Sequence, residues 1–336
     1  MTKHLCRLLM LLCMPAAASL YAAEDFYIGQ GGYELCKEGR HLKPFGNGCG
    51  NRRIAITEVL PRLTPNANAV SIWITRDWQE DWYDAQEIEQ QFINKGYTPL
   101  FIFYWFADEI SPDFIEQNRA AYFKDLQRFT RFISRIKGKK LVILNPEFNQ
   151  NGAEAYEPFN DLLIQSMREV RKAGQTKASF CIGDFGNYSQ IIDLNNWKDF
   201  HPSVHRAAKE ADFISFQEMR AVTRNSPAQI AKTAYRSLAF ATYLHETYNK
   251  PTFLAYLALS SYGKGGEAMQ AHVYQGITDL MPLFREHADM IGFNSFHLID
   301  IPDHQGYFNE AEKHFGLLDK TGNAKPALAP FLQLTR

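Results

Sequence analysis

From residue 68 onward the chain alternates short apolar runs with longer amphipathic segments. Such runs are typical of buried parallel strands, and the segments between them of the helices that connect those strands. The runs predict seven strands, at Val70–Ile74, Pro99–Tyr104, Leu141–Asn145, Ser179–Ile182, Phe213–Phe216, Thr252–Tyr256 and Met290–Phe296. The segments predict helices at Asp84–Lys95, Asp113–Lys137, Glu157–Ala173, Ser203–Ala211, Pro227–Tyr248 and Glu267–His287. Gly96, Gly138 and Gly174 follow three of these helices, where a left-handed residue commonly ends a helix.

An eighth strand would close these units into a ring. Asp25–Gly31 is the candidate, and Ile54–Leu63 would supply the connection that follows it. A doubly wound open sheet is the alternative, but no glycine-rich phosphate loop follows any early strand. The chain has neither internal repeats nor a low-complexity linker, so the pattern predicts a single α/β domain over residues 24–336, folded as a (β/α)8 TIM barrel.

The first 23 residues have the pattern of a secretory signal peptide. Basic residues begin the segment, the apolar run Leu8–Met14 follows, and Ala22-Ala23 provide small residues for cleavage. The run is too short to span a bilayer comfortably, and no later run is long enough. We therefore expect cleavage near Ala23 and an exported mature chain, periplasmic or extracellular, without a membrane span.

Composition and cysteines refine this picture. With 46 % hydrophobic residues, 336 residues can bury a large core, and a formal charge of −1 without a basic patch makes nucleic acid an unexpected partner. Cys36 and Cys49 are close enough in sequence to form a disulfide in an oxidising compartment, with two free thiols as the alternative. Cys181 lies within an apolar strand pattern, which predicts a buried thiol.

Polar and aromatic residues gather where the predicted strands end. In TIM barrels the loops after the strands converge on one mouth, which carries the chemistry. The residues predicted to meet there are Trp73, Trp78, Trp105, Asn145, Glu147, Asn149, Asp184, Glu218, Arg220, Tyr256 and His297. An aromatic content of 14 % also favours a carbohydrate ligand, because sugar sites use aromatic rings.

Glu147 is the candidate proton donor for cleavage of a glycosidic bond. This reaction uses one carboxylic acid and a second carboxylate. Four apolar residues lead directly to Glu147, and partial burial keeps an acid protonated near neutral pH. A structural ion pair with an arginine is the alternative. Glu218 is the candidate second carboxylate, and its alternative is a salt bridge to Arg220 or Arg224.

The remaining residues at the predicted mouth suggest how a sugar would be bound. Trp73, Trp78 and Trp105 are candidates for stacking on pyranose rings, although buried core aromatics are the usual explanation for any one of them. Candidate polar contacts come from Asn145, Asn149, Asp184, Arg220 and His297. His297, Asp300, Asp303 and His304 lack the spacing of a metal site, so we expect neither a metal nor a cofactor.

Several of these motifs resemble those of clan A glycoside hydrolases, most closely the β-mannanase-type enzymes of family 26. There the fourth strand ends in His-Glu-Met-Asn-Gly, whose Glu is the general acid. This chain has Pro146-Glu147-Phe148-Asn149, with Gly152 after a two-residue insertion. The segments 211–216 and 316–327 are similar to the sixth strand and the closing turn of such enzymes. The resemblance implies a TIM barrel that hydrolyses a polysaccharide, with Glu147 as the acid.

The seventh strand departs from the family pattern. Family members carry a nucleophilic Glu there, whereas this chain has Tyr256 and no acidic residue between Lys250 and Gly266. Three hypotheses follow. Glu218 replaces the missing carboxylate; Tyr256 is the nucleophile or the substrate assists; or the barrel is catalytically inactive and binds or scaffolds a polysaccharide. The sequence identifies neither the sugar nor the oligomeric state.

Overall fold

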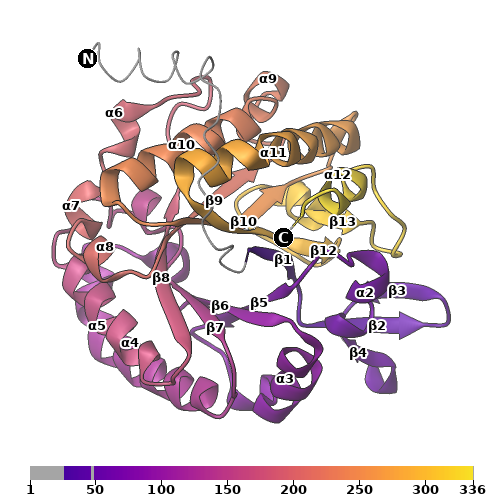
Figure 1. Ribbon diagram of the computed structural model, residues 1–336, viewed down its shortest axis with the longest axis horizontal. Coiled ribbons are helices and arrows are strands. Elements are labelled where there is room, and N and C mark those ends of the chain that lie inside the picture. The colour runs from indigo at the N-terminus through magenta and orange to yellow at the C-terminus, as the bar shows by residue number, and fades with distance from the viewer. Residues whose placement is uncertain (1–25, 47–48, 336) are drawn as a thin grey trace.

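The computed structural model describes residues 26–46 and 49–335, and it shows a closed barrel of eight parallel strands with helices around it (Figure 1). The predicted signal peptide therefore lies outside the described residues. In order around the ring, the barrel strands are β1 (Tyr27–Gly31), β5 (Ala69–Thr75), β6 (Thr98–Tyr104), β7 (Lys140–Leu144), β8 (Thr176–Gly183), β9 (Ile214–Arg220), β10 (Thr252–Leu259) and β11 (Met290–Ser295). The predicted (β/α)8 TIM barrel is confirmed.

Helices cover the outside of the barrel. They are α2 (Leu60–Leu63), α3 (Ala85–Gln91), α4 (Pro112–Ser134), α5 (Phe159–Arg171), α6 (Leu194–Trp197), α7 (His201–Val204), α8 (Ala207–Glu210), α9 (Pro227–Ile230), α10 (Thr233–Tyr248), α11 (Gly266–Ala288) and α12 (Leu328–Leu332). Each of the six predicted segments overlaps at least one of them, and α6 and α12 were not predicted. The three predicted glycine ends, Gly96, Gly138 and Gly174, all have positive φ. No helix of the described residues is both long and apolar enough to cross a membrane.

The connection between β1 and β5 differs from the prediction. The only helices in the predicted segment Ile54–Leu63 are the 3-10 helix Ile56–Glu58 and the short α2, and most of the connection is a small antiparallel sheet of β2 (Glu34–Glu38), β3 (His41–Pro44) and β4 (Arg53–Ala55). This sheet projects beside the barrel in Figure 1. The predicted disulfide between Cys36 and Cys49 is present and ties β2 to the segment before β4. The sheet, rather than a helix, therefore occupies this side of the ring.

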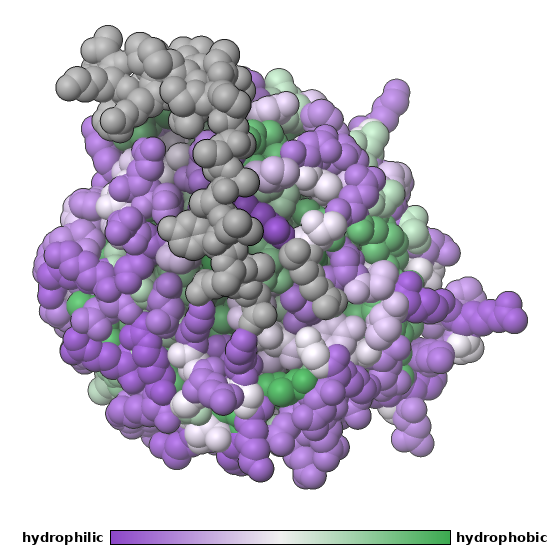
Figure 2. Space-filling model, in the orientation of Figure 1, coloured by the Kyte–Doolittle hydropathy of each residue, from purple (hydrophilic) through white to green (hydrophobic). Residues whose placement is uncertain are grey.

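Two buried clusters share the core. One lies inside the ring and includes Leu100, Ile102, Leu141 and Ile143, whereas the other lies between the strands and the helices. Each barrel strand is therefore buried on both of its faces, as in other parallel sheets. The outer surface is largely hydrophilic on the face shown in Figure 2. A second small pair, β12 (His297–Ile299) and β13 (Gly316–Leu318), follows the last barrel strand.

Candidate active site

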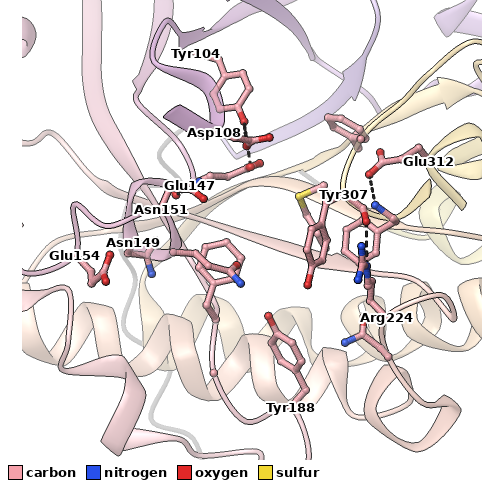
Figure 3. Close-up of a pocket in the computed structure, with 18 of the residues that line it drawn as sticks. Tyr104, Asp108, Glu147, Asn149, Asn151, Glu154, Tyr188, Arg224, Tyr307 and Glu312 are labelled. Atoms are coloured by element: carbon pink, nitrogen blue, oxygen red, sulfur yellow. Dashed lines mark hydrogen bonds between the residues drawn. The ribbon is translucent and has the colours of Figure 1, made fainter. Parts of the chain in front are cut away.

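A cavity of about 1050 Å³ opens at the carboxyl ends of the barrel strands (Figure 3). Residues from the ends of β5, β6 and β9 and from the loops after β7, β8 and β11 form its walls. Its carboxyl-bearing residues are Asp108, Glu147, Glu154, Asp199 and Glu312. This is the end of the barrel where TIM-barrel enzymes hold their active sites.

Glu147 reaches the cavity through an unusual turn. Asn145 and Glu147 have φ values of 47° and 68°. This is a left-handed backbone geometry that residues other than glycine rarely adopt. Phe148, the next residue, is fully buried and packs on Phe159 with ring centroids 5.1 Å apart. The turn thus buries Phe148 while the Glu147 carboxyl lines the cavity. Backbone strain of this kind concentrates at functional sites.

Two tyrosine hydroxyls hold the Glu147 carboxyl. The Tyr256 hydroxyl donates to Oε1 at 2.6 Å, and the Tyr104 hydroxyl lies 3.2 Å from Oε2 and 2.7 Å from Oδ1 of Asp108. Burial raises the pKa of Glu147, and this effect is larger than the opposite effect of the hydrogen bond from Tyr256, which lowers the pKa. Burial, followed by the charge of Glu147, also raises the pKa of Tyr104 and Tyr256, so both tyrosines keep their protons at neutral pH.

The hydrogen-bond network around Glu147 contains more acceptor oxygens than tyrosine hydroxyl protons. Tyr256 also donates to Oε1 of Gln217, so the two hydroxyl protons face four acceptor oxygens: two on Glu147 and one each on Asp108 and Gln217. Each hydroxyl has a single proton to donate. A further proton on Glu147 would supply one of the missing donors. Tyr104 and Tyr256 thus each divide one proton between Glu147 and a second acceptor, and a protonated Glu147, the form that a general acid requires, could itself donate within this network.

A β-bulge directs Tyr256 into the barrel. The register of β10 shifts between Leu254 and Tyr256 against β9. As a result Ala255 and Tyr256 both join the inner cluster, whereas Leu254 and Leu257 on either side pack outward. Bulges commonly redirect a side chain beside an active site. Tyr256 is fully buried beneath Glu147, so it supports that carboxyl from below.

Glu218 does not lie in the cavity, contrary to its predicted position at the mouth. It is fully buried and faces α10, where the Ser237 hydroxyl donates to its Oε1 at 3.0 Å, and its Oε2 lies 2.8 Å from Arg220. The reason is the alternation of side chains along β9. Gln217 points into the barrel and Glu218 points toward the helices. The alternative that the sequence left open, a salt bridge to Arg220, describes its environment.

Asp184 and Arg220 are also buried behind the cavity wall. Asp184 is 1 % exposed, and its carboxylate pairs with Arg236 at 2.6 Å and with Arg220 at 3.3 Å. The Arg220 guanidinium lies 3.8 Å from the ring centre of Tyr188, a residue that does line the cavity. Neither predicted sugar contact is therefore direct, and both residues support the wall.

One of the three candidate tryptophans lines the cavity. Trp73 does so, with its ring edge-on to Tyr104, Tyr256 and Phe296. Trp78 is 1 % exposed and packs on aromatic residues of α4, and Trp105 is 2 % exposed with its Nε1 bonded to Asp125 at 2.8 Å. Those two rings belong to the core between strands and helices, so their predicted role in sugar stacking does not fit their positions.

The remaining predicted contacts divide in the same way. Asn145 is buried and donates to the Tyr122 hydroxyl at 3.0 Å, away from the cavity. Asn149 lines the cavity and is held by two bonds to the backbone of Gly183. His297 lines it as well, and burial lowers the pKa of its imidazole well below the ordinary value, so the ring is neutral at pH 7.

The histidine and aspartate residues after β11 are not arranged around a metal position. Asp300 forms a buried ion pair with Lys325 at 2.6 Å, and the His297 and His304 rings pack edge-on with centroids 5.3 Å apart. Throughout residues 26–46 and 49–335, no group of three or more His, Cys, Asp or Glu side chains is placed to hold a metal ion.

Several residues of the cavity were not assigned a role from the sequence. They are Tyr104, Asp108, Tyr188, Arg224, Tyr307 and Glu312, and the buried Gln217 lies behind them, hydrogen-bonded to Tyr256. Tyr104 and Asp108 follow the predicted third strand, so their position was a usable signal. Gln217 becomes apparent only once the inward face of β9 is known, and Tyr307 and Glu312 come from an irregular segment after the last strand.

Solved structures with a similar fold are carbohydrate-active barrels. A fungal β-1,4-galactanase matches with a TM-score of 0.60 and 10 % identity over 92 % of this chain and 99 % of that one. The catalytic core of xylanase A matches with 0.58 and 12 % identity over 92 % and 97 %. A GH5_18 protein from Bifidobacterium longum subsp. infantis matches with 0.55 and 12 % identity over 82 % and 72 %. No protein-family model and no curated protein matches the chain. The chain thus shares the TIM-barrel fold of these structures.

Proposed function

We propose that this protein hydrolyses a glycosidic bond of a polysaccharide or oligosaccharide, with Glu147 as the proton donor. The observation that carries the proposal is the environment of Glu147. Its carboxyl follows the fourth barrel strand, lines the cavity, has a raised pKa because of burial, and shares tyrosine protons with a second carboxyl. The fold of the glycoside hydrolases that it resembles supports the same reaction class.

Asp108 is the second carboxylate that we propose in place of Glu218. Because both carboxyls contact the Tyr104 hydroxyl, their nearest oxygens are no more than about 6 Å apart. Retaining glycosidases place the two groups about 5–5.5 Å apart and inverting enzymes about 6.5–9.5 Å apart; the retaining separation is compatible with this bound, and retention is the mechanism that we propose. Glu218 is buried on the far side of β9. Tyr256 is fully buried and keeps its proton, so we do not propose it as the nucleophile.

In this mechanism Glu147 and Asp108 act in two steps. Glu147 gives its proton to the glycosidic oxygen as the bond to the anomeric carbon breaks, and the Asp108 carboxylate bonds to that carbon. Glu147, now ionised, removes a proton from a water molecule, whose oxygen displaces Asp108 and regenerates both carboxyls. Trp73 and Asn149 would contact the sugar from the cavity wall.

The test is Glu147→Gln, which keeps the shape of the side chain and removes the acid. We expect hydrolysis of a glycan from a panel of polysaccharides to fall by about 10²–10⁴-fold, measured as reducing ends released, while binding of that glycan persists. The panel includes β-mannan, because the motif around Glu147 resembles family 26. Unchanged turnover would contradict the assignment.

For Asp108→Asn we expect a comparable loss of hydrolysis, measured in the same way. A near-normal rate of hydrolysis would leave Asp108 a supporting role.

A carbohydrate-binding protein without catalysis is the second candidate. The observation in its favour is that the inward position on β10 carries Tyr256 and that β10 itself provides no carboxyl to the cavity. This candidate predicts measurable affinity for a glycan and no reducing ends after long incubation. Steady release of product that depends on Glu147 would exclude it.

We also propose that the mature chain is exported. The pattern of the first 23 residues supports this, and so does the disulfide between Cys36 and Cys49, because such bonds persist in oxidising compartments. Export would bring the protein to polysaccharides outside the cytoplasm. Cell fractionation with detection of the shortened chain tests the proposal, and retention of the full-length chain in the cytoplasm would contradict it.

A further inference from the structure

Two arginines at the end of β9 have opposite surroundings. Arg220, the last residue of the strand, has a side chain only 2 % exposed, and its charge is balanced by Asp184 at 3.3 Å and Glu218 at 2.8 Å. Arg224, four residues later, is exposed and lines the cavity. Arg220 therefore serves the interior of the protein, whereas Arg224 faces whatever occupies the cavity.

The charge of Arg224 is not balanced by the protein. Its Nε donates to the backbone oxygen of Tyr307 at 3.1 Å, and its guanidinium lies 4.4 Å from the centre of the Tyr307 ring. In the part of the chain that the structure describes, no carboxylate pairs with it. These two contacts fix the plane of the guanidinium, and its terminal nitrogens have no acceptor among residues 26–46 and 49–335.

Tyr307 completes a binding surface beside this cation. Its side chain belongs to the lining of the cavity and is 59 % exposed, which is unusual for a large aromatic residue. The apolar faces of sugar rings pack well on such rings. Glu312, the carboxyl of this segment that lines the cavity, is 3 % exposed and accepts the backbone N–H of Phe308 at 2.9 Å. A flat ring and an uncompensated guanidinium therefore lie together.

This surface lies across the cavity from the proposed catalytic carboxyls. Figure 3 shows Glu147, Asp108 and Glu154 on one side, and Arg224 and Tyr307 on the other. Carboxylates on the first side repel an anionic group, and the guanidinium on the second side attracts it. A glycan that bears one acidic sugar would therefore be bound in a single orientation.

We infer that Arg224 and Tyr307 form a subsite for an acidic sugar residue, so that the substrate is an anionic glycan carrying a uronate or a sulfated sugar. The inference rests on the proposed function and names its substrate class. The guanidinium would bind the oxygens of the anionic group, and Tyr307 would pack against the ring that carries it.

The experiment compares polysaccharides in matched pairs. Each uronate-containing polymer is paired with its carboxyl-reduced form, and each sulfated polymer with its desulfated form, so that linkage and sugar backbone are the same within a pair. Binding is measured on Glu147→Gln, which removes turnover from the measurement. We expect at least one acidic polymer to bind about tenfold or more tightly than its neutral partner. The pair that shows the preference identifies carboxylate or sulfate.

Two variants separate the contribution of the Arg224 charge from that of the Tyr307 ring. Arg224→Gln should abolish the preference, whereas Tyr307→Ala should weaken binding of both members of a pair, because the neutral partner also loses the ring on which the sugar packs. Arg62→Gln, an exposed arginine on α2 outside the cavity, is the matched control and should leave the ratio unaltered. Raised salt should reduce the preference.

The inference and the proposed function fail in different ways. Equal binding within every pair, absence of binding to every acidic polymer, or a preference that survives Arg224→Gln would overturn the acidic subsite. A preference that depends on Arg224 without any release of reducing ends by the unmodified protein would uphold the subsite and contradict hydrolysis.

Discussion

The protonation of Glu147 depends on opposing contributions from its neighbours. Burial and the charge of Asp108 raise its pKa, while hydrogen bonds from Tyr256, Tyr104 and Gln217 stabilise the carboxylate and lower the pKa. Burial is the largest of these contributions, so the protonated form persists above the ordinary range of a glutamic acid. A proton donor at neutral pH requires this condition.

Tyr256→Phe should shift the pH dependence of hydrolysis to higher pH. Activity of a general acid falls as the pH rises through its pKa. The hydroxyl of Tyr256 stabilises the ionised form, so its loss raises the pKa of Glu147 further. The basic limb of the kcat/KM profile should therefore move upward. Tyr274→Phe, which removes a buried hydroxyl bonded to Ser295 on the outer side of the barrel, is the control and should leave the limb in place. A limb that moves downward or not at all would contradict the role of Tyr256.

At the scale of elements, a buried charge cluster fixes the loop after β8. Arg236 of α10 pairs with Asp184 at 2.6 Å and lies 3.4 Å from Asp193, and it donates to the backbone oxygens of Asn187 and Gln190. One helix residue thus holds both ends of a loop that contributes Tyr188 to the cavity. Lys232, the residue immediately before α10, adds a second tie, because its Nζ donates to the backbone oxygen of Ser189 at 2.6 Å.

Arg236→Ala should destabilise the protein by about 3–5 kcal/mol, because it leaves buried carboxylates without their partner. Urea unfolding measures the change. Arg168→Ala breaks an exposed ion pair with Glu210 and should cost less than about 1 kcal/mol. Equal effects of the two substitutions would show that the buried cluster does not contribute as we expect.

At the scale of the whole molecule, Asn68 helps to close the ring. Strand β1 completes the barrel between β11 and β5, and it has only five residues. The Asn68 side chain accepts the backbone N–H of Ile28 at 2.7 Å and donates to the backbone oxygen of Phe26 at 2.8 Å. The side chain therefore extends the pairing of β1 beyond its junction with β5.

Asn68→Ala should lower the free energy of unfolding by about 1–3 kcal/mol, because two backbone groups lose their partners. We expect β1 to gain the largest increase in amide hydrogen exchange. Asn94→Ala, at an exposed position of the 3-10 helix Ile93–Lys95, should change stability by less than about 0.5 kcal/mol. Exchange that increases elsewhere first would indicate that closure does not depend on this residue.

The order of strands and helices was largely predictable from the sequence, because the spacing of apolar residues differs between a buried strand and an amphipathic helix. The left-handed ends at Gly96, Gly138 and Gly174 follow from the same local reasoning. The first connection was not predictable in this way. A disulfide-linked sheet with strands of three to five residues has no extended hydrophobic pattern, so the sequence indicated only Ile54–Leu63 as the connection and not the sheet before it.

By itself, the sequence determined the architecture, the disulfide and the strand end that carries Glu147, because these depend on periodicity and on neighbours along the chain. The tertiary structure decided which polar residues share the cavity. A barrel strand is buried on both faces, so hydrophobicity does not reveal that Gln217 points inward and Glu218 outward. Nor does it reveal the bulge that turns Tyr256 toward Glu147, since that depends on pairing with strands distant in sequence.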